Sequence, residues 1–123
     1  MKLLYIEDSA DAAADVSALL ARQGSQVVWE KEGEAGLRRA AMEPFDAIIL
    51  DRMLPDMDGV ETLAGVRELK GGTETPVVFM TAKAQTHEQQ QYLDLGALSV
   101  IVKPFDAFSL GDQLRSLWQA QAD

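Results

Sequence analysis

The sequence predicts an α/β domain whose parallel sheet is covered by helices on both faces. Short apolar runs alternate five times with segments of helical periodicity. Runs such as Ala47–Leu50 and Val77–Met80 are apolar throughout rather than at every second position, which is typical of strands buried on both faces. Regular alternation of strand and helix favours crossover connections and hence parallel strands. We expect a single domain over residues 1–123, with no internal linker or repeat.

Each element follows from a local signal. The strands are apolar runs, and we predict them at Lys2–Ile6, Gln26–Trp29, Ala47–Leu50, Val77–Met80 and Leu98–Val102. The helices have apolar residues at helical spacing, and we predict them at Asp11–Gln23, Glu34–Met42, Val60 to Arg67, Gln85–Leu95 and Leu110 to Trp118. The first four helices end at the breakers Gly24, Pro44, Gly71-Gly72 and Gly96.

Composition excludes several classes of function. With no cysteine, the chain has no thiolate chemistry, no disulfide and no Cys-based zinc site. The 20 acidic residues outnumber the 11 basic ones, and a net charge of −9 disfavours direct binding to nucleic acid. The longest apolar runs are far shorter than the roughly 18 residues that a membrane span requires. Met1-Lys2 leads directly into the first strand without a signal-peptide pattern. We therefore expect a cytoplasmic protein with no membrane contact.

Polar residues follow the apolar runs, at the strand ends where parallel α/β sheets bind ligands. Glu7 and Asp8 follow the first strand and Asp51 follows the third, so neighbouring strands would bring three carboxylates together. Such a cluster is unfavourable without a cation. Carboxylate oxygens point to Mg²⁺, or to Mn²⁺, rather than to zinc. Asp8 or Ser9 could instead cap the first helix.

Four motifs, in their order and at their strand-end positions, resemble the receiver domain of two-component response regulators. They are Glu7-Asp8-Ser9, the segment from Asp51 to Gly59 (DRMLPDMDG), Met80-Thr81-Ala82-Lys83, and Lys103-Pro104-Phe105. The resemblance covers essentially the whole chain. It implies a flavodoxin-like (βα)5 fold with five parallel strands in the order 2-1-3-4-5.

The same resemblance implies roles for individual residues. Asp51 would be the phosphoacceptor, while Thr81 and Lys103 would contact the phosphoryl group. Mg²⁺ would bind Asp8, Asp51 and the backbone carbonyl of Met53, with Glu7 acting mainly through water. The implied partners are a sensor histidine kinase or histidine phosphotransfer protein of a phosphorelay, and a downstream target or fused output domain. The chain would be a signalling phosphoacceptor that takes part in its own phosphorylation and dephosphorylation, rather than an enzyme.

The sequence departs from the receiver-domain pattern at two points, and other functions must be compared with it. Val100 stands where many receivers have an aromatic residue, so the aromatic rotamer switch of those receivers cannot operate here. The last helix lacks the Glu and Arg placement typical of receivers that dimerise before driving DNA-binding domains. For the oligomeric state, a monomer and a phosphorylation-dependent dimer both stay open. A phosphatase like the haloacid dehalogenases would need a second aspartate where Met53 stands. A flavin module is disfavoured because Glu7-Asp8 would repel the flavin phosphate. A degenerate receiver that acts only as an interaction module is the remaining alternative.

Overall fold

The computed structural model describes residues 2–51, 59–69, 75–81, 90, 93–94, 97 and 99–102. Five strands and three helices lie in these ranges in the order β1 (Lys2–Ile6), α1 (Ala10–Arg22), β2 (Gln26–Glu30), α2 (Gly33–Met42), β3 (Ala47–Asp51), α3 (Gly59–Glu68), β4 (Val77–Thr81) and β5 (Ser99–Val102). The predicted fourth helix lies largely, and the predicted fifth helix entirely, outside the described residues.

All strand pairs in the sheet are parallel, and the strand order is β2-β1-β3-β4-β5. The predicted fold class and strand order are therefore confirmed. Ile6 pairs with Glu30 of β2 on one side and with Leu50 of β3 on the other, so these strands end at nearly the same level. The register thus brings the residues that follow β1 and β3 to one edge of the sheet.

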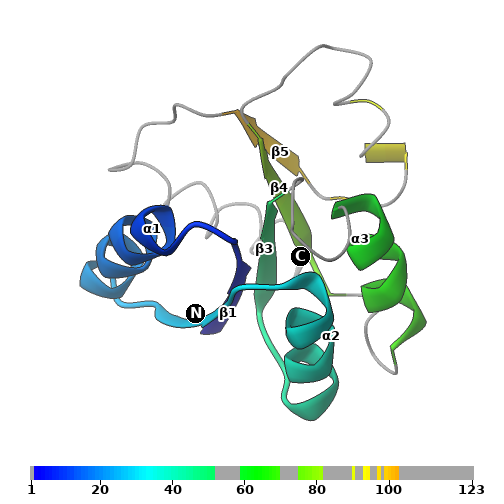
Figure 1. The fold of residues 1–123 in the computed structure, drawn as a ribbon, viewed down its shortest axis with the longest axis horizontal. Coiled ribbons are helices and arrows are strands. Elements are labelled where there is room, and N and C mark those ends of the chain that lie inside the picture. Colours follow the sequence, from blue (N-terminus) through cyan, green and yellow to red (C-terminus); the bar gives the residue numbers. More distant parts are fainter. Residues whose placement is uncertain are drawn as a thin grey trace, which may run out of the picture.

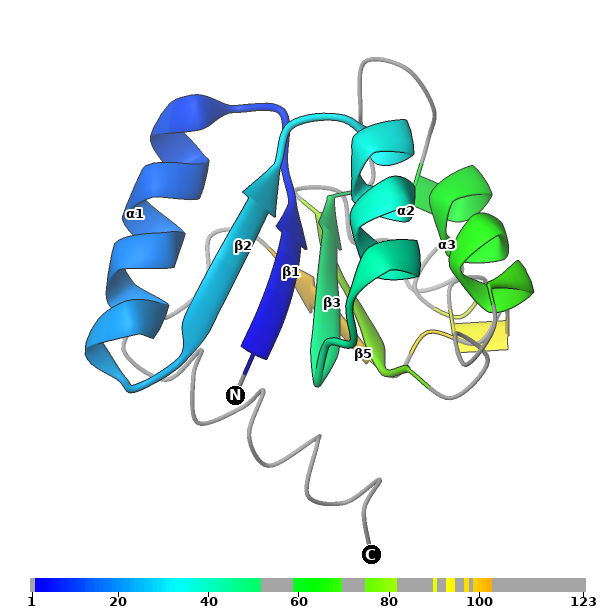
Figure 2. The same cartoon turned by 90° about the horizontal axis from the view of Figure 1, so that it is seen from below.

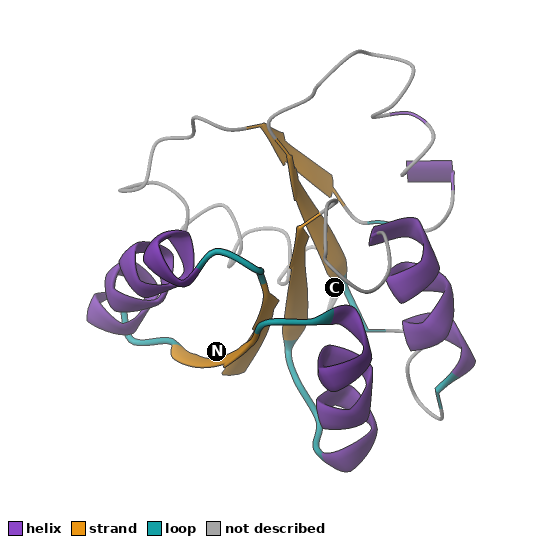
Figure 3. Cartoon of the chain, viewed as in Figure 1, coloured by secondary structure: helices purple, strands orange, loops and turns teal. Residues whose placement is uncertain are grey.

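The sheet has an apolar core on each face. Figures 1 and 2 show from two directions that α1 lies on one side of the sheet and α2 and α3 on the other. On one face, Ala13, Val16 and Leu20 of α1 pack against alternate residues of β1, β3 and β4. On the other, α2 and α3 pack against the intervening strand residues. Because β1, β3 and β4 are covered on both faces, their residues are apolar in continuous runs. Figure 3 shows the strands between the helices on either side.

Close packing joins the second helix to the strand that precedes the acidic residues. At Gly36 of α2, an added Cβ atom would lie 2.8 Å from Cγ1 of Ile6 and would overlap its Cδ1 atom. Ile6 is completely buried at the end of β1. Glycine at this position therefore lets the helix backbone approach the sheet more closely than any other residue would allow.

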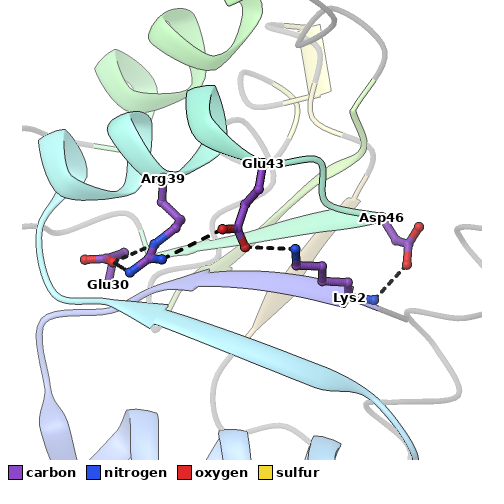
Figure 4. A network of polar contacts seen from close by, with 5 residues as sticks. All are labelled: Lys2, Glu30, Arg39, Glu43 and Asp46. Carbon is purple, nitrogen blue, oxygen red and sulfur yellow. Dashed lines mark hydrogen bonds and ion pairs between the residues drawn. The ribbon is translucent and has the colours of Figure 1, made fainter.

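Charged side chains link α2 and the turn that follows it to β1 and β2 (Figure 4). Lys2 Nζ lies 2.8 Å from Glu43 Oε1, and the Lys2 backbone N–H donates to Asp46 over 2.7 Å. Arg39 donates to Glu30 from both Nε and Nη2, at 3.2 and 3.0 Å. The hydrogen bond from Lys2 is the main reason that the pKa of Glu43 lies below its ordinary value.

None of the helices in the described ranges combines the length and the apolar character that a membrane-spanning helix needs.

Candidate metal centre

Three carboxylates meet at the edge of the sheet where β1 and β3 end. Asp51 is the last residue of β3, and Glu7 and Asp8 directly follow β1. Carboxylate oxygens from all three residues lie within 4.8 Å of one another. Glu7 is 2% exposed and Asp51 is 9% exposed, whereas Asp8 is exposed to solvent. The predicted gathering of these residues is confirmed, and the cluster is open to solvent on the side of Asp8.

The chemistry of this cluster fits a hard divalent cation. Carboxylates at this separation repel one another, and burial of two of them strengthens the repulsion by lowering the local dielectric. A bound cation would reverse the sign of this interaction. Carboxylate oxygens suit Mg²⁺ or Mn²⁺, and the exposed side leaves room for the water or phosphate ligands that Mg²⁺ retains.

The first turn of α1 shows whether Asp8 or Ser9 caps the helix. Ser9 is the N-cap residue, and its hydroxyl accepts a hydrogen bond from the Ala12 backbone N–H over 3.3 Å. Asp8 precedes the cap, and its carboxylate is instead part of the acidic cluster. The capping function thus falls to the serine, and the aspartate is available as a ligand.

Tyr5 lies beneath the acidic cluster and was not expected to belong to the site. Its side chain is fully buried, and its hydroxyl has no hydrogen-bond partner among the described residues. Burial raises the pKa of Tyr5, and the negative charges of Glu7 and Asp51 raise it further. Tyr5 lies in β1, two residues before Glu7. Within the apolar run Lys2–Ile6 the tyrosine is indistinguishable from an ordinary core residue.

A second residue missed by the sequence analysis is Trp29, on the edge strand β2. Its indole Nε1–H donates to the backbone carbonyl oxygen of Glu7 over 2.7 Å. The Glu7 backbone N–H donates to the Glu30 carbonyl oxygen over 3.1 Å. Two consecutive residues of β2 therefore hold the backbone on both sides of Glu7.

The remaining predicted site residues are described less fully. Thr81 is the last residue of β4, and its neighbour Met80 pairs with Asp51, so its backbone lies one step beyond the acidic residue. Met53 and Lys103 lie outside the described residues. The structure thus brings together the three acidic residues, while the predicted roles of Met53, Thr81 and Lys103 stay predictions.

The fold and the acidic cluster define a doubly wound α/β protein with its site at the carboxyl edge of a parallel sheet. Within this class, residues 3–115 match the family model of the response regulator receiver domain. The chain belongs to this family and is a receiver domain of the two-component type.

Known relatives and structures agree with this assignment. The transcriptional regulatory protein DltR of Streptococcus agalactiae (strain NEM316) is 42% identical over 115 residues, which are 94% of this chain and 50% of DltR. The response regulator ArlR of Staphylococcus epidermidis (strain RP62A) is 36% identical over 98% of this chain and 54% of its own length. The chain thus spans about half the length of these curated relatives.

Among solved structures, the chain resembles the chemotaxis response regulator CheY4 of Vibrio cholerae, with a TM-score of 0.87, 30% identity, and coverage of 94% of this chain and 97% of that one. It also resembles the receiver domain of the sensor histidine kinase PA1611 from Pseudomonas aeruginosa. There the TM-score is 0.88, the identity is 26%, and the coverage is 96% of this chain and 97% of that one. The latter structure has a magnesium ion coordinated in its active site cleft.

Proposed function

We propose that Asp51 accepts a phosphoryl group from a phosphohistidine of a sensor histidine kinase or phosphotransfer protein. A carboxylate oxygen of Asp51 attacks phosphorus, an acyl phosphate forms, and the bond between phosphorus and the imidazole nitrogen breaks. The electron pair of that bond returns to the imidazole, which takes up a proton. The observation that carries this proposal is the acidic cluster itself, in which Asp51 ends a buried strand with two further carboxylates within 4.8 Å.

Glu7, Asp8 and Asp51 are the residues that would hold Mg²⁺, with Mn²⁺ as a substitute, and the Met53 carbonyl would complete the protein ligands. When bound, the ion would offset negative charge on the phosphoryl group. The fit of the donor set supports this proposal, and the magnesium ion in the PA1611 receiver domain supports it by analogy. The buried strands β1 and β3 keep Glu7 and Asp51 in position before the phosphodonor arrives.

We propose roles for two residues outside the acidic cluster as well. Thr81, which ends β4 next to the level of Asp51, would donate its hydroxyl to the phosphoryl group, and the Lys103 ammonium would contact another phosphoryl oxygen. The domain, spanning residues 1–123, would act in the cytoplasm as a signalling protein rather than as an enzyme. It would pass its state to a protein target or to an output domain beyond these residues.

Intact-mass measurement after incubation with acetyl phosphate tests the proposal. The wild-type chain should gain the mass of one phosphoryl group in MgCl₂ and none in EDTA. Asp51→Asn should gain none, whereas Asp15→Asn, which removes an exposed aspartate of α1, should behave as wild type. Hydroxylamine should reverse the gain because it cleaves acyl phosphates. A folded wild-type chain that gains no mass from this donor or from a phosphorylated kinase would refute the proposal and favour a phosphorylation-independent interaction module.

A further inference from the structure

The Trp29 side chain forms a hydrogen bond that would not be expected from its position on the edge strand β2 alone. Its side chain is 39% exposed, yet the indole nitrogen donates to the Glu7 carbonyl over 2.7 Å. The two residues are 22 positions apart: Trp29 lies in β2, and Glu7 directly follows β1. This hydrogen bond lies directly beyond Ile6 and Glu30, which are the last paired residues of β1 and β2, at the point where the chain leaves the sheet.

The accepting carbonyl belongs to the peptide bond that joins Glu7 to Asp8. Rotation of this peptide would swing the Asp8 Cα atom and displace the carboxylate that it carries. The preceding peptide is held as well, because the Glu7 N–H donates to Glu30 over 3.1 Å. With both peptides anchored to β2, the backbone at Glu7 has little freedom to turn.

Asp8 depends on this restraint more than the other two acidic residues of the cluster do. Glu7 and Asp51, at 2% and 9% exposure, are held by the packing around β1 and β3. Asp8 is exposed and lies between the end of β1 and the Ser9 cap of α1, so packing does little to fix it. Repulsion from the other two carboxylates also favours its movement away from them while no cation is bound.

We infer that Trp29 is a positioning residue for the metal centre: its indole N–H fixes the Glu7–Asp8 peptide and so keeps the Asp8 carboxylate within reach of the cation. This inference rests on the proposed binding of Mg²⁺ by the acidic cluster. The tryptophan would touch neither the metal nor the phosphoryl group. Its effect would be to hold one ligand in place, as outer-shell hydrogen bonds do in other metal sites.

A merely structural role for Trp29 predicts a different result. If the ring only shields the edge of the sheet, its replacement lowers the stability of the fold and leaves the metal affinity of the folded protein unchanged. If the indole N–H positions Asp8, its loss weakens metal binding even where the ring and its packing are retained. Metal affinity and unfolding temperature must therefore be measured on the same variants.

The experiment titrates the metal-free protein with MnCl₂ and follows unbound Mn²⁺ by electron paramagnetic resonance, with MgCl₂ as competitor. Trp29→Phe keeps an aromatic ring and removes the donor, and we expect about 10-fold weaker binding, the lower end of the range for outer-shell hydrogen bonds. Trp118→Phe, which replaces the other of the chain's 2 tryptophans, is the matched control and should bind as wild type. In the Trp118→Phe background, benzothienylalanine at position 29 keeps the shape of indole without its N–H and should show the same loss as Trp29→Phe.

The outcomes separate the two proposals. Failure of the wild-type protein to bind Mn²⁺ or Mg²⁺ would overturn the metal centre and this inference with it. Wild-type binding together with unchanged affinity in the benzothienylalanine protein would overturn the positioning role of Trp29 alone. Weaker binding with a nearly unchanged unfolding temperature would support it.

Discussion

Asp51→Asn should make the metal-free protein more stable, although it removes the proposed phosphoacceptor. The substitution keeps the size of the side chain and deletes one of three charges whose oxygens lie within 4.8 Å. At that distance two unit charges repel by about 0.9 kcal/mol in water and by about 3.5 kcal/mol at an effective dielectric of about 20. Because Asp51 and Glu7 are both nearly buried, the repulsion between them should be close to the higher value. The repulsion that involves the exposed Asp8 should be close to the lower value.

We expect a net gain of about 1–3 kcal/mol, less than the sum of the pair energies because part of the repulsion is already relieved by hydration and relaxation. This corresponds to a rise in unfolding temperature of about 3–5 °C for each kcal/mol in a domain of this size. Urea unfolding in EDTA, followed by circular dichroism, measures the gain. Asp15→Asn is the control, since it removes one exposed charge outside the cluster and should change stability by about 0.5 kcal/mol or less.

Magnesium should reduce the difference in stability between the two proteins. A ligand that binds only the folded state stabilises it by about 1.4 kcal/mol at ten times its Kd. The wild-type protein should therefore gain stability as MgCl₂ is added, and Asp51→Asn, with one ligand weakened, should gain less. If Asp51→Asn is less stable than wild type in EDTA, carboxylate repulsion does not dominate the metal-free site and the expected gain is wrong.

Two further predictions concern the packing and charges around α2. Gly36→Ala should lower the unfolding free energy by about 1–2 kcal/mol, because overpacking against buried Ile6 outweighs the gain in helix propensity. Gly65→Ala is its control: the atoms nearest to the new Cβ would be the two methyl groups of the half-buried Leu37 side chain, which can move aside, and urea unfolding should show a change of about 0.5 kcal/mol or less. The lowered pKa of Glu43 means that its bond to Lys2 stabilises the fold above the ordinary value of 4.5, and that this contribution disappears as pH falls through the lowered pKa. Glu43→Gln should thus be less stable than wild type at neutral pH and equal to it in acid; a pH-independent difference in unfolding free energy would contradict this.

The sheet could be predicted because its signals are strong and local. Runs such as Ala47–Leu50 are apolar on both faces, and that pattern follows directly from burial between two layers of helices. The observed bounds differ by a residue at several ends. β2 extends to Glu30 because this residue still pairs with Ile6, although its charge marked the end of the apolar run. α1 begins at Ala10 because Ser9 supplies the cap.

The acidic part of the site could also be predicted, because Glu7, Asp8 and Asp51 follow strands that a parallel sheet brings to one edge. The contributions of Tyr5 and Trp29 could not. Each lies in a strand where an aromatic side chain is ordinary. The hydrogen bond of Trp29 and the unpartnered position of the Tyr5 hydroxyl among the described residues depend on strand register and ring orientation. The predicted strand order already placed β2 beside β1, but the sequence does not show which side chain of β2 reaches the Glu7 carbonyl oxygen.

The two-sided burial of β1, β3 and β4 has a consequence for native-state hydrogen exchange. Backbone amides in such strands exchange mainly when the whole domain unfolds, whereas helices packed on one face can detach in smaller openings. Glu7 directly follows β1 and Asp51 ends β3, so we expect them to stay in place while α2 or α3 transiently opens. The two carboxylates would then keep their positions while the more easily opened segments of the domain rearrange.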